Sequence, residues 1–200
     1  DNIIGAASCT TNAIVPVLKV INDEFGIISG HIETVHAYTN DQNLIDNFHE
    51  KSRRGRSAAL NLVITETGAG TAVGKILPEL EGKLTANAIR VPTPNVSLAI
   101  MKLNLGKSLE VTELNNFLRQ TAFHSKYKDQ IDFTNSTEIV SSDFVGNRYA
   151  GIIDSAATIC NENHAILYVW YDNEFGYTVQ LLGLAKEMVG LTYKRYPEYQ

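Results

Sequence analysis

Apolar residues near the start of the chain recur at intervals of three and four, which is the spacing of one face of a helix. These residues are Ile14, Val17, Leu18, Ile21 and Phe25. The spacing predicts a helix over residues 10–25, with Ser8 as a favourable N-cap and Gly26 as a C-terminal stop. Pro16 lies inside this helix and is expected to bend it or to start its regular part.

The pattern then changes to the alternation of a strand over residues 30–38. One face of this strand carries Ile32, Thr34, His36 and Tyr38. Residues 39–57 follow neither period. A long irregular segment inside a compact domain is usually functional or disordered.

The remaining segments alternate between the two patterns. Helices are predicted over about 69–77, 111–123 and 173–190, with a helical turn at 126–131. Extended segments are predicted at 88–94, 97–105, 139–140, 149–153, 156–160 and 165–170, with a hairpin turn at 161–164. This order of elements indicates an α+β domain with a mixed, largely antiparallel sheet.

Composition and charge narrow the class of protein. The 200 residues are 44% hydrophobic, which supports a sizeable core, and the net charge of −5 argues against a specific nucleic-acid binder. We find no secretory signal and no apolar run that could span a bilayer, so no membrane partner is expected. Cys9 and Cys160 do not make a disulfide framework, and a cytoplasmic location is expected.

Cys9 is the first candidate for chemistry, because it falls in the first turn of the first predicted helix. Free backbone N–H groups and the helix dipole favour negative charge at that position. The sequence therefore predicts a thiol with a depressed pKa, which would be a nucleophile near neutral pH. A small buried cysteine without a chemical role is the alternative, and we expect Cys160 to be a core residue of that kind.

Other polar features suggest anion binding without proving it. His36 ends its predicted strand and opens a polar cluster, although a histidine in that position is more often a surface residue. The basic run at 53–56 could hold a phosphate, since guanidinium groups match phosphate oxygens, but such a run is most often a solvated patch. The glycine turn at 65–75 fits neither the P-loop nor the dinucleotide fingerprint. Arg90 is the only charged residue of its extended segment, and a lone arginine of this kind usually lies on the surface without a specific function.

Several motifs, taken in order, resemble those of the phosphorylating glyceraldehyde-3-phosphate dehydrogenases. They are Ser8-Cys9-Thr10-Thr11-Asn12, Thr34-Val35-His36-Ala37-Tyr38-Thr39, Arg53-Arg54-Gly55-Arg56, Thr67-Gly68, Arg90-Val91-Pro92-Thr93 and Trp170-Tyr171-Asp172-Asn173-Glu174-Phe175-Gly176-Tyr177. Each motif is weak alone, but their shared order is specific, and the resemblance covers essentially the whole chain. It implies a mixed, largely antiparallel sheet with helices on one face.

The resemblance implies a role for each candidate residue. Cys9 is the nucleophile, and His36 is the base that activates it. The pockets for the substrate phosphate and for inorganic phosphate are formed by Ser8, Thr10, Thr39, Arg54, Thr67, Gly68 and Arg90. Thr39 serves the substrate's own phosphate, although the division between the pockets shifts between states. The implied cofactor is NAD, with its carboxamide held by Asn173 and with Tyr177 close by; no metal site is assigned.

The implied reaction is the glycolytic oxidation and phosphorylation of glyceraldehyde 3-phosphate to 1,3-bisphosphoglycerate. It passes through a hemithioacetal and a thioester on the cysteine. The implied partners are the phosphorylated aldehyde, inorganic phosphate and further copies of the chain, because the family is tetrameric through the sheet face of this domain.

The resemblance also divides the chain. Residues 1–172 are expected to form the catalytic domain, and residues 173–200 a helix and tail that pack on a nucleotide-binding domain. The fingerprint of that domain does not occur here, and the abrupt start at Asp1 leads us to expect a fragment without its N-terminal half. NAD binding and turnover are therefore expected to need the absent domain. Asn47-Phe48 stand where many NAD-using members carry Leu-Pro, which leaves NADP open.

Three alternatives remain at this point. The same fold could act on erythrose 4-phosphate with the same cysteine and histidine. A cysteine hydrolase could use Cys9 and His36 as a dyad, but it would explain neither the anion pockets nor Asn173. A non-catalytic assembly module is the third alternative, since a truncated catalytic domain could serve that purpose.

Overall fold

The first helix grows from the apolar stripe at the start of the sequence, and the sheet packs around it. α1 (Cys9–Phe25) begins after Ser8, whose hydroxyl oxygen accepts a hydrogen bond from the backbone N–H of Thr11 at 3.1 Å. It ends before Gly26, which adopts a φ of 68°. The predicted cap and stop are both confirmed, and the helix is continuous across Pro16. The computed structural model describes residues 3–191.

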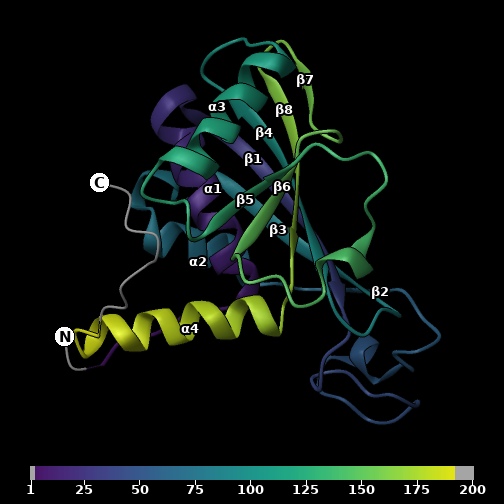
Figure 1. The fold of residues 1–200 in the computed structure, drawn as a ribbon. Coiled ribbons are helices and arrows are strands. Elements are labelled where there is room, and N and C mark those ends of the chain that lie inside the picture. Colours follow the sequence, from purple (N-terminus) through teal and green to yellow (C-terminus); the bar gives the residue numbers. More distant parts are fainter. Residues whose placement is uncertain (1–2, 192–200) are drawn as a thin grey trace.

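The other helices are shorter; α2 and α3 lie between strands in the sequence, and α4 follows the last strand (Figure 1). The α-helices are α2 (Ala69–Ile76), α3 (Val111–His124) and α4 (Phe175–Met188). Three 3-10 turns are η1 (Ser52–Gly55), η2 (Pro78–Leu80) and η3 (Ser141–Phe144). Within the described residues, no helix combines the length and the apolar character that crossing a membrane requires.

The strands form one open sheet with the order β2-β3-β1-β4-β8-β6-β5, and β7 pairs with β8 outside this path. Their bounds are β1 (Ile27–Ala37), β2 (Val63–Thr65), β3 (Leu84–Val91), β4 (Ser97–Leu105), β5 (Ile131–Thr134), β6 (Gly151–Asp154), β7 (Ile159–Asn161) and β8 (His164–Tyr171). Only β1–β3 and β5–β6 are parallel among the described pairings. The expected mixed, largely antiparallel α+β sheet is confirmed.

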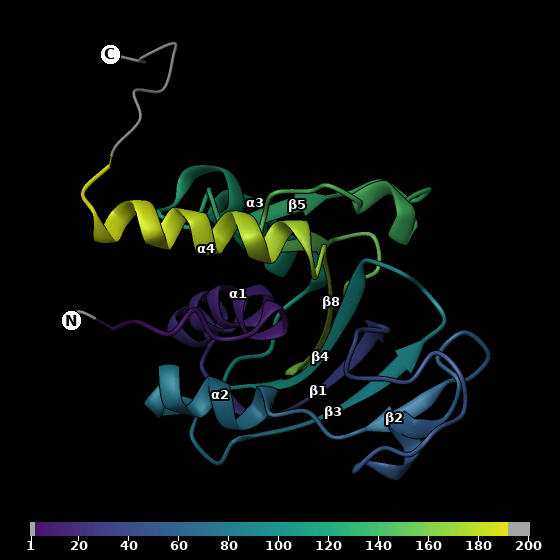
Figure 2. The same ribbon diagram turned by 90° about the horizontal axis from the view of Figure 1, so that it is seen from below.

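The main core lies between the sheet and α1. Ile14, Leu18 and Ile21 of α1 are fully buried, and they belong to one apolar cluster with Met101 of β4 and Leu167 of β8. Figure 2 shows α1 and α2 on one side of the sheet, with α4 running beyond α1. Packing against the sheet therefore fixes the position of α1 and of its first turn.

Four expectations about extended structure and turns need correction. Residues 139–140 are not a strand but precede η3, where the backbone N–H of Val140 bonds to Asp143. The predicted helical turn at 126–131 is present over 126–130, where the backbone N–H of Ile131 bonds to the carbonyl of Tyr127 at 2.9 Å, but the strand β5 that begins at Ile131 was not expected. β3 begins at Leu84, well before residue 88. The sequence pattern did not show this start, because the polar residues Thr85 and Asn87, whose side chains bond to His31 of β1, interrupt the apolar residues. β1 likewise begins earlier than expected, at Ile27.

Candidate functional site

A cavity of about 460 Å³ opens at the N-terminus of α1, and we name it the Cys9 cavity. It is lined by residues from α1, the end of β1, the segment 39–57, the turn before α2, and β3. Every residue assigned from the sequence to the nucleophile–base pair and to the phosphate pockets lines it. These residues are Ser8, Cys9, Thr10, His36, Thr39, Arg54, Thr67, Gly68 and Arg90. The fold thus collects distant motifs into one site.

Cys9 and His36 face each other across this cavity. The Sγ atom of Cys9 lies 3.6 Å from Nε2 of His36. The thiol is placed by the first turn of α1, and the ring by the end of β1, where it is only 7% exposed. Ala7, which precedes the helix cap, has a φ of 57°, and this bend directs the chain into α1.

The other ring nitrogen of His36 is held by the backbone. Nδ1 lies 2.6 Å from the carbonyl oxygen of Ala37 and 2.9 Å from Nη1 of Arg90. Arg90 Nη1 also donates to the same carbonyl at 2.9 Å. In the tautomer with the proton on Nδ1, His36 donates to the carbonyl of Ala37, and Arg90 Nη1, which can only donate, is served by the same carbonyl. Nε2 therefore presents its lone pair to the thiol, as a base must.

The pKa shifts correct one expectation. Burial lowers the pKa of His36 to about 4, and the charge of Arg90 adds to this effect. Burial also raises the pKa of Cys9, although the backbone N–H of Thr10 and the charge of Arg90 pull it down. The depressed thiol pKa predicted from the helix start is wrong, because desolvation outweighs the helix N–H groups. Thiol and imidazole are consequently both neutral at rest.

The two arginines of the cavity differ in how far they are engaged. Arg54 is buried; it forms an ion pair with Asp41 and donates from Nε to Thr65 Oγ1 at 2.9 Å. Arg90 contacts Thr39 Oγ1 at 3.3 Å and forms no ion pair with any described residue. The charge of Arg90 is therefore the one more available to an anion in the cavity.

Several hydroxyl groups of the cavity are already hydrogen-bonded. Thr10 Oγ1 lies 2.9 Å from the hydroxyl of Tyr171, which is buried and whose pKa is raised by that burial. Thr67 Oγ1 accepts from the backbone N–H of Ala69 at 3.2 Å, at the start of α2. Gly68 is the N-terminal cap residue of this helix. The hydroxyl of Thr10 is thus shared with Tyr171, and its backbone N–H faces Cys9.

Asn173 and Tyr177 do not line the Cys9 cavity. Asn173 is 6% exposed, and its Oδ1 accepts a hydrogen bond from Ser97 at 2.9 Å. Ser97 follows Val96, whose φ of 67° is strained for a β-branched residue. Tyr177 donates to the carbonyl of Ala7 at 3.2 Å, so it holds the bend before Cys9. Of the two, only Tyr177 bonds to a residue that lines the Cys9 cavity, namely Ala7.

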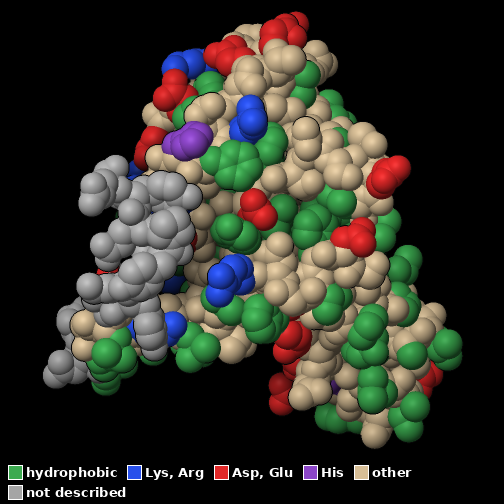
Figure 3. All heavy atoms as spheres, in the orientation of Figure 1, with side chains coloured by type: hydrophobic (Ala, Val, Ile, Leu, Met, Phe, Trp, Pro, Cys, Tyr) green, Lys and Arg blue, Asp and Glu red, His purple; other side chains and the backbone are tan. Residues whose placement is uncertain are grey.

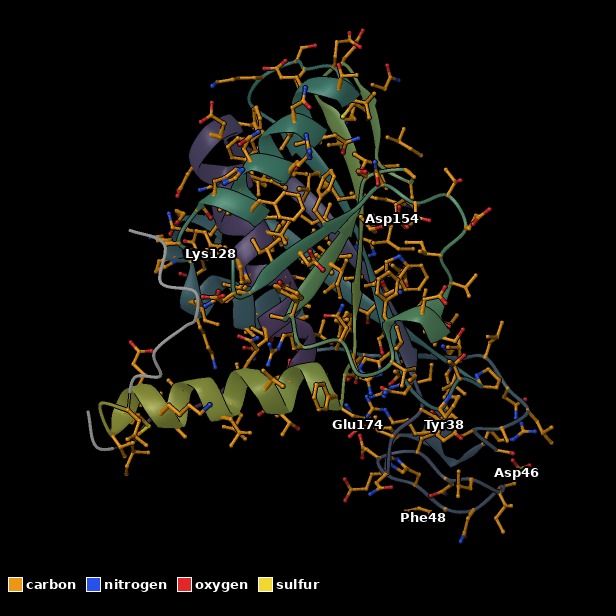
Figure 4. The ribbon with its side chains drawn as sticks, viewed as in Figure 1. Tyr38, Asp46, Phe48, Lys128, Asp154 and Glu174 are labelled. Carbon is orange, nitrogen blue, oxygen red and sulfur yellow. The ribbon has the colours of Figure 1, made fainter. Side chains whose placement is uncertain are left out.

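A second, larger cavity of about 870 Å³ adjoins the first at Thr39 and reaches from Tyr38 to Glu174. Figure 4 shows Glu174 near Tyr38, while Asp46 and Phe48 lie at the far end of the segment 39–57. Phe48 is 86% exposed. The segment is irregular apart from η1, as the sequence indicated.

Sequence reasoning did not single out two charged residues of the Cys9 cavity. Lys51 and Glu66 both line it, and their side chains lie 3.8 Å apart as an ion pair. Lys51 lies two positions before the basic run at 53–56, and extending that run by two residues would have found it. Tyr171 was quoted only as part of a motif, and its bond to Thr10 could be seen only in the structure.

The fold and the cavity together define an α+β domain that carries a cysteine–histidine pair beside a basic pocket. Residues 8–173 match the family described as "Glyceraldehyde 3-phosphate dehydrogenase, C-terminal domain". The chain belongs to this family, whose members carry the domain that the sequence motifs indicated.

Relatives of known name agree with this assignment. A "Glyceraldehyde-3-phosphate dehydrogenase-like protein" of Pseudomonas aeruginosa (strain UCBPP-PA14) is 64% identical over 98% of this chain and 43% of its own length. "Glyceraldehyde-3-phosphate dehydrogenase" of Mycobacterium leprae (strain TN) is 45% identical over 97% of this chain and 56% of its own length. "Glyceraldehyde-3-phosphate dehydrogenase 2" of Nostoc sp. (strain PCC 7120 / SAG 25.82 / UTEX 2576) is 44% identical over 92% of this chain and 55% of its own length. The chain spans about half the length of the curated relatives it matches.

Proposed function

We propose that this chain is the catalytic part of a cytoplasmic, glycolytic dehydrogenase that oxidises and phosphorylates glyceraldehyde 3-phosphate to 1,3-bisphosphoglycerate. The observation that carries the proposal is the contact of 3.6 Å between Cys9 Sγ and His36 Nε2 beside the uncompensated charge of Arg90. A nucleophile, a base and an anion pocket are what the reaction requires of this half.

The first step begins from neutral partners. His36 Nε2 takes the thiol proton as Cys9 Sγ forms a bond to the aldehyde carbon. The protonated His36 then gives this proton to the aldehyde oxygen, which completes the hemithioacetal. The transfer is brief, because burial and Arg90 keep the pKa of His36 at about 4. The neutral imidazole is then again able to take the hydroxyl proton of the hemithioacetal.

Asn173 and Tyr177 are the residues of this chain that would hold or border a nicotinamide ring. Asn173 fits a carboxamide, because its buried Oδ1 is fixed by Ser97 and its Nδ2 has only one contact among the described residues, at 3.3 Å to Glu174. NAD, when bound, supplies the acceptor for the hydride that leaves the hemithioacetal carbon.

The cysteine then carries a thioester, and inorganic phosphate is the second nucleophile. A phosphate oxygen attacks the thioester carbon, the C–S bond breaks, and Cys9 leaves as a thiolate that regains a proton. The backbone N–H groups at the start of α1 and the residues Thr67, Gly68 and Arg90 would hold the phosphate anion. Arg54 and Thr39 would complete the pockets, with Arg54 shared between the ligand and Asp41.

Residues 1–172 are proposed as the catalytic domain, and residues 173–200 as a helix and tail that pack on a nucleotide-binding domain. Positions 192–200 lie outside the described residues. Leu182 and Met188 of α4 are about half exposed, which suits a helix with a further packing partner. The proposed assembly is a homotetramer through the sheet face, and the chain alone is expected to bind NAD poorly and to lack turnover.

The proposal can be tested on the chain itself through the reactivity of Cys9. Glyceraldehyde 3-phosphate should slow alkylation of Cys9 by iodoacetamide, measured by mass spectrometry, because it forms the hemithioacetal. Glyceraldehyde, which lacks the phosphate, should protect far less, and Cys160 in the same molecule should be unaffected. Arg90→Gln should abolish the difference between the two aldehydes. Equal protection by both aldehydes in the parent would refute the phosphate pocket, and a turnover assay with NAD and phosphate would test the expected inactivity.

A further inference from the structure

The hydroxyl group of Ser97 bonds to two residues that belong to different parts of the candidate site. Ser97 is the first residue of β4 and is 1% exposed. Its Oγ accepts a hydrogen bond from the backbone N–H of Ala37 at 3.1 Å and donates one to Oδ1 of Asn173 at 2.9 Å. One buried hydroxyl therefore contacts both the neighbour of His36 and the residue proposed to hold a carboxamide.

The side chain of Ser97 replaces a bond that the sheet cannot make at this point. β1 and β4 pair as far as Val35 and Leu98, and the same register, if continued, would set Ala37 opposite Val96. Val96 instead has a φ of 67°, which takes its backbone out of the extended conformation. Ala37 is fully buried, so its N–H needs an acceptor inside the protein, and the Ser97 hydroxyl supplies it.

Ala37 is also the residue that holds the ring of His36. Its carbonyl oxygen lies 2.6 Å from Nδ1 of His36 and accepts from Nη1 of Arg90 at 2.9 Å. Without the Ser97 hydroxyl, the end of β1 would carry a buried, unpaired N–H and would shift to satisfy it. The ring of His36 would shift with Ala37, and so would Nε2, which lies 3.6 Å from the sulfur of Cys9.

The same hydroxyl sets the direction of the Asn173 amide. Ser97 donates its only hydroxyl hydrogen to Oδ1, and Nδ2 lies 3.3 Å from the carboxylate of Glu174. The reverse orientation would set Oδ1 against that carboxylate, so the donor end of the amide is the one left for a ligand. Figure 3 shows acidic side chains at the surface between the start of α4 and the segment 39–57, where Figure 4 labels Glu174. Ser97 is not part of this surface, and its two bonds are made away from solvent.

We propose that Ser97 is a positioning residue, whose hydroxyl holds the base His36 and the amide of Asn173 in one fixed geometry. The inference rests on the proposed function, in which His36 takes the hydroxyl proton while Asn173 holds the ring that receives the hydride. Both groups must be aligned in the same step, and a shared hydrogen-bond partner limits their independent motion. Ser97 itself touches no reacting atom.

Ser97→Ala tests the proposal on the chain itself, because it removes only the hydroxyl. NMR of the isotope-labelled chain should show displaced signals for the ring nitrogens of His36 and for the side-chain amide of Asn173. The ratio of Cys9 to Cys160 alkylation by iodoacetamide near neutral pH should fall about threefold or more, since the base no longer faces the thiol as before. A ratio equal to that of the parent would overturn the proposal, whatever the loss of stability.

Two further comparisons separate positioning from stability. Ser97→Thr and Ser97→Val have the same shape and differ in the hydroxyl, so the alkylation ratio should be higher for the Thr variant; equal ratios would contradict the proposal. Ser155→Ala removes a hydroxyl that donates to the carbonyl of Thr134 at 2.8 Å. This control should lower the free energy of unfolding without changing the alkylation ratio, and a ratio that falls as far as in Ser97→Ala would mean that general destabilisation is the cause.

The proposal and the proposed function can fail separately. If Ser97→Ala changes the His36 signals and the alkylation ratio, but glyceraldehyde 3-phosphate does not protect Cys9 in the parent, the positioning role stands and the proposed function falls. If the aldehyde protects Cys9 as expected and Ser97→Ala behaves like the parent, only the positioning role falls.

Discussion

The helices α1 and α4 both begin beside the Cys9 site, but they end in different environments. α1 buries ten of its residues, from Thr10 to Phe25, whereas only Gly176 of α4 is buried. Both helices are rich in apolar residues. In α1 these residues gather on the side that faces the sheet, and in α4 they are spread around the helix, with Leu182 54% exposed.

The comparison shows that arrangement, and not apolar content, decides which helix forms the core. A single apolar stripe can be covered by one sheet, so α1 is held along its whole length and its first turn is fixed. α4 is held chiefly at its start, where the carboxylate of Asp172 accepts the backbone N–H groups of Glu174 and Phe175 at 2.9 and 2.8 Å. Cys9, the proposed nucleophile, therefore sits on the helix that is buried along its length, and Tyr177 of α4 contacts the preceding bend at Ala7.

Matched truncations in the two helices should give the largest contrast. Leu18→Ala in α1 removes a fully buried side chain and should cost about 2–5 kcal/mol of unfolding free energy through lost burial and a cavity. Leu182→Ala in α4 should cost about 0.5 kcal/mol or less, because the side chain is half exposed. Urea unfolding of the two variants would measure both values. Equal losses would mean that α4 is covered in solution.

Acid should destabilise the fold through His36, which faces the start of α1. The folded-state pKa of His36 is about 4, below its ordinary 6.5, because burial disfavours the charged ring. The neutral, buried His36 ring therefore contributes fully to the free energy of unfolding above pH 6.5. This contribution, about 3 kcal/mol, is lost as the pH falls from 6.5 toward 4. Urea unfolding at stepped pH values should show this slope, and His36→Asn should flatten it. Identical slopes for parent and variant would contradict the buried neutral ring.

The two helix starts should respond differently to loss of the residue that precedes them. Ser8→Ala removes the hydroxyl that accepts the N–H of Thr11 and should cost about 1 kcal/mol. Glu174→Ala, before α4, should cost far less, since Glu174 makes no side-chain cap bond and Asp172 already serves the N–H groups there. Thermal unfolding of both variants would decide, and a larger loss for Glu174→Ala would reverse the assignment of the caps.

Arg90→Gln should produce the smallest change in stability but a clear change in titration. The guanidinium group lowers the pKa of both His36 and Cys9, so its loss should raise both pKa values. Histidine NMR signals would follow the first, and the pH dependence of iodoacetamide alkylation the second. Cys160, whose raised pKa has no contribution from Arg90, serves as the internal reference. An unchanged His36 titration would mean that burial alone sets its pKa.

The nine residues that the family resemblance assigned to the nucleophile–base pair and the phosphate pockets all line the Cys9 cavity, whereas Lys51 and Glu66 of the same cavity were not singled out. The edges of the fold were harder to predict. The short strand β5 was not predicted, and a strand was wrongly predicted at 139–140. Four residues or fewer carry too little periodicity to separate a strand from a turn.

The sequence by itself determined the first helix to within one residue, its Ser8 cap and the α+β class, since these follow from local periodicity and residue chemistry, whereas the roles proposed for Cys9 and His36 rest on the resemblance to a family. Only the tertiary structure decided how Cys9 and His36 behave. Parallel pairing of β1 with β3 brings Arg90 opposite His36, and the core buries the thiol. Desolvation depends on every segment that packs around a group, so a pKa set by burial cannot be derived from neighbours along the chain.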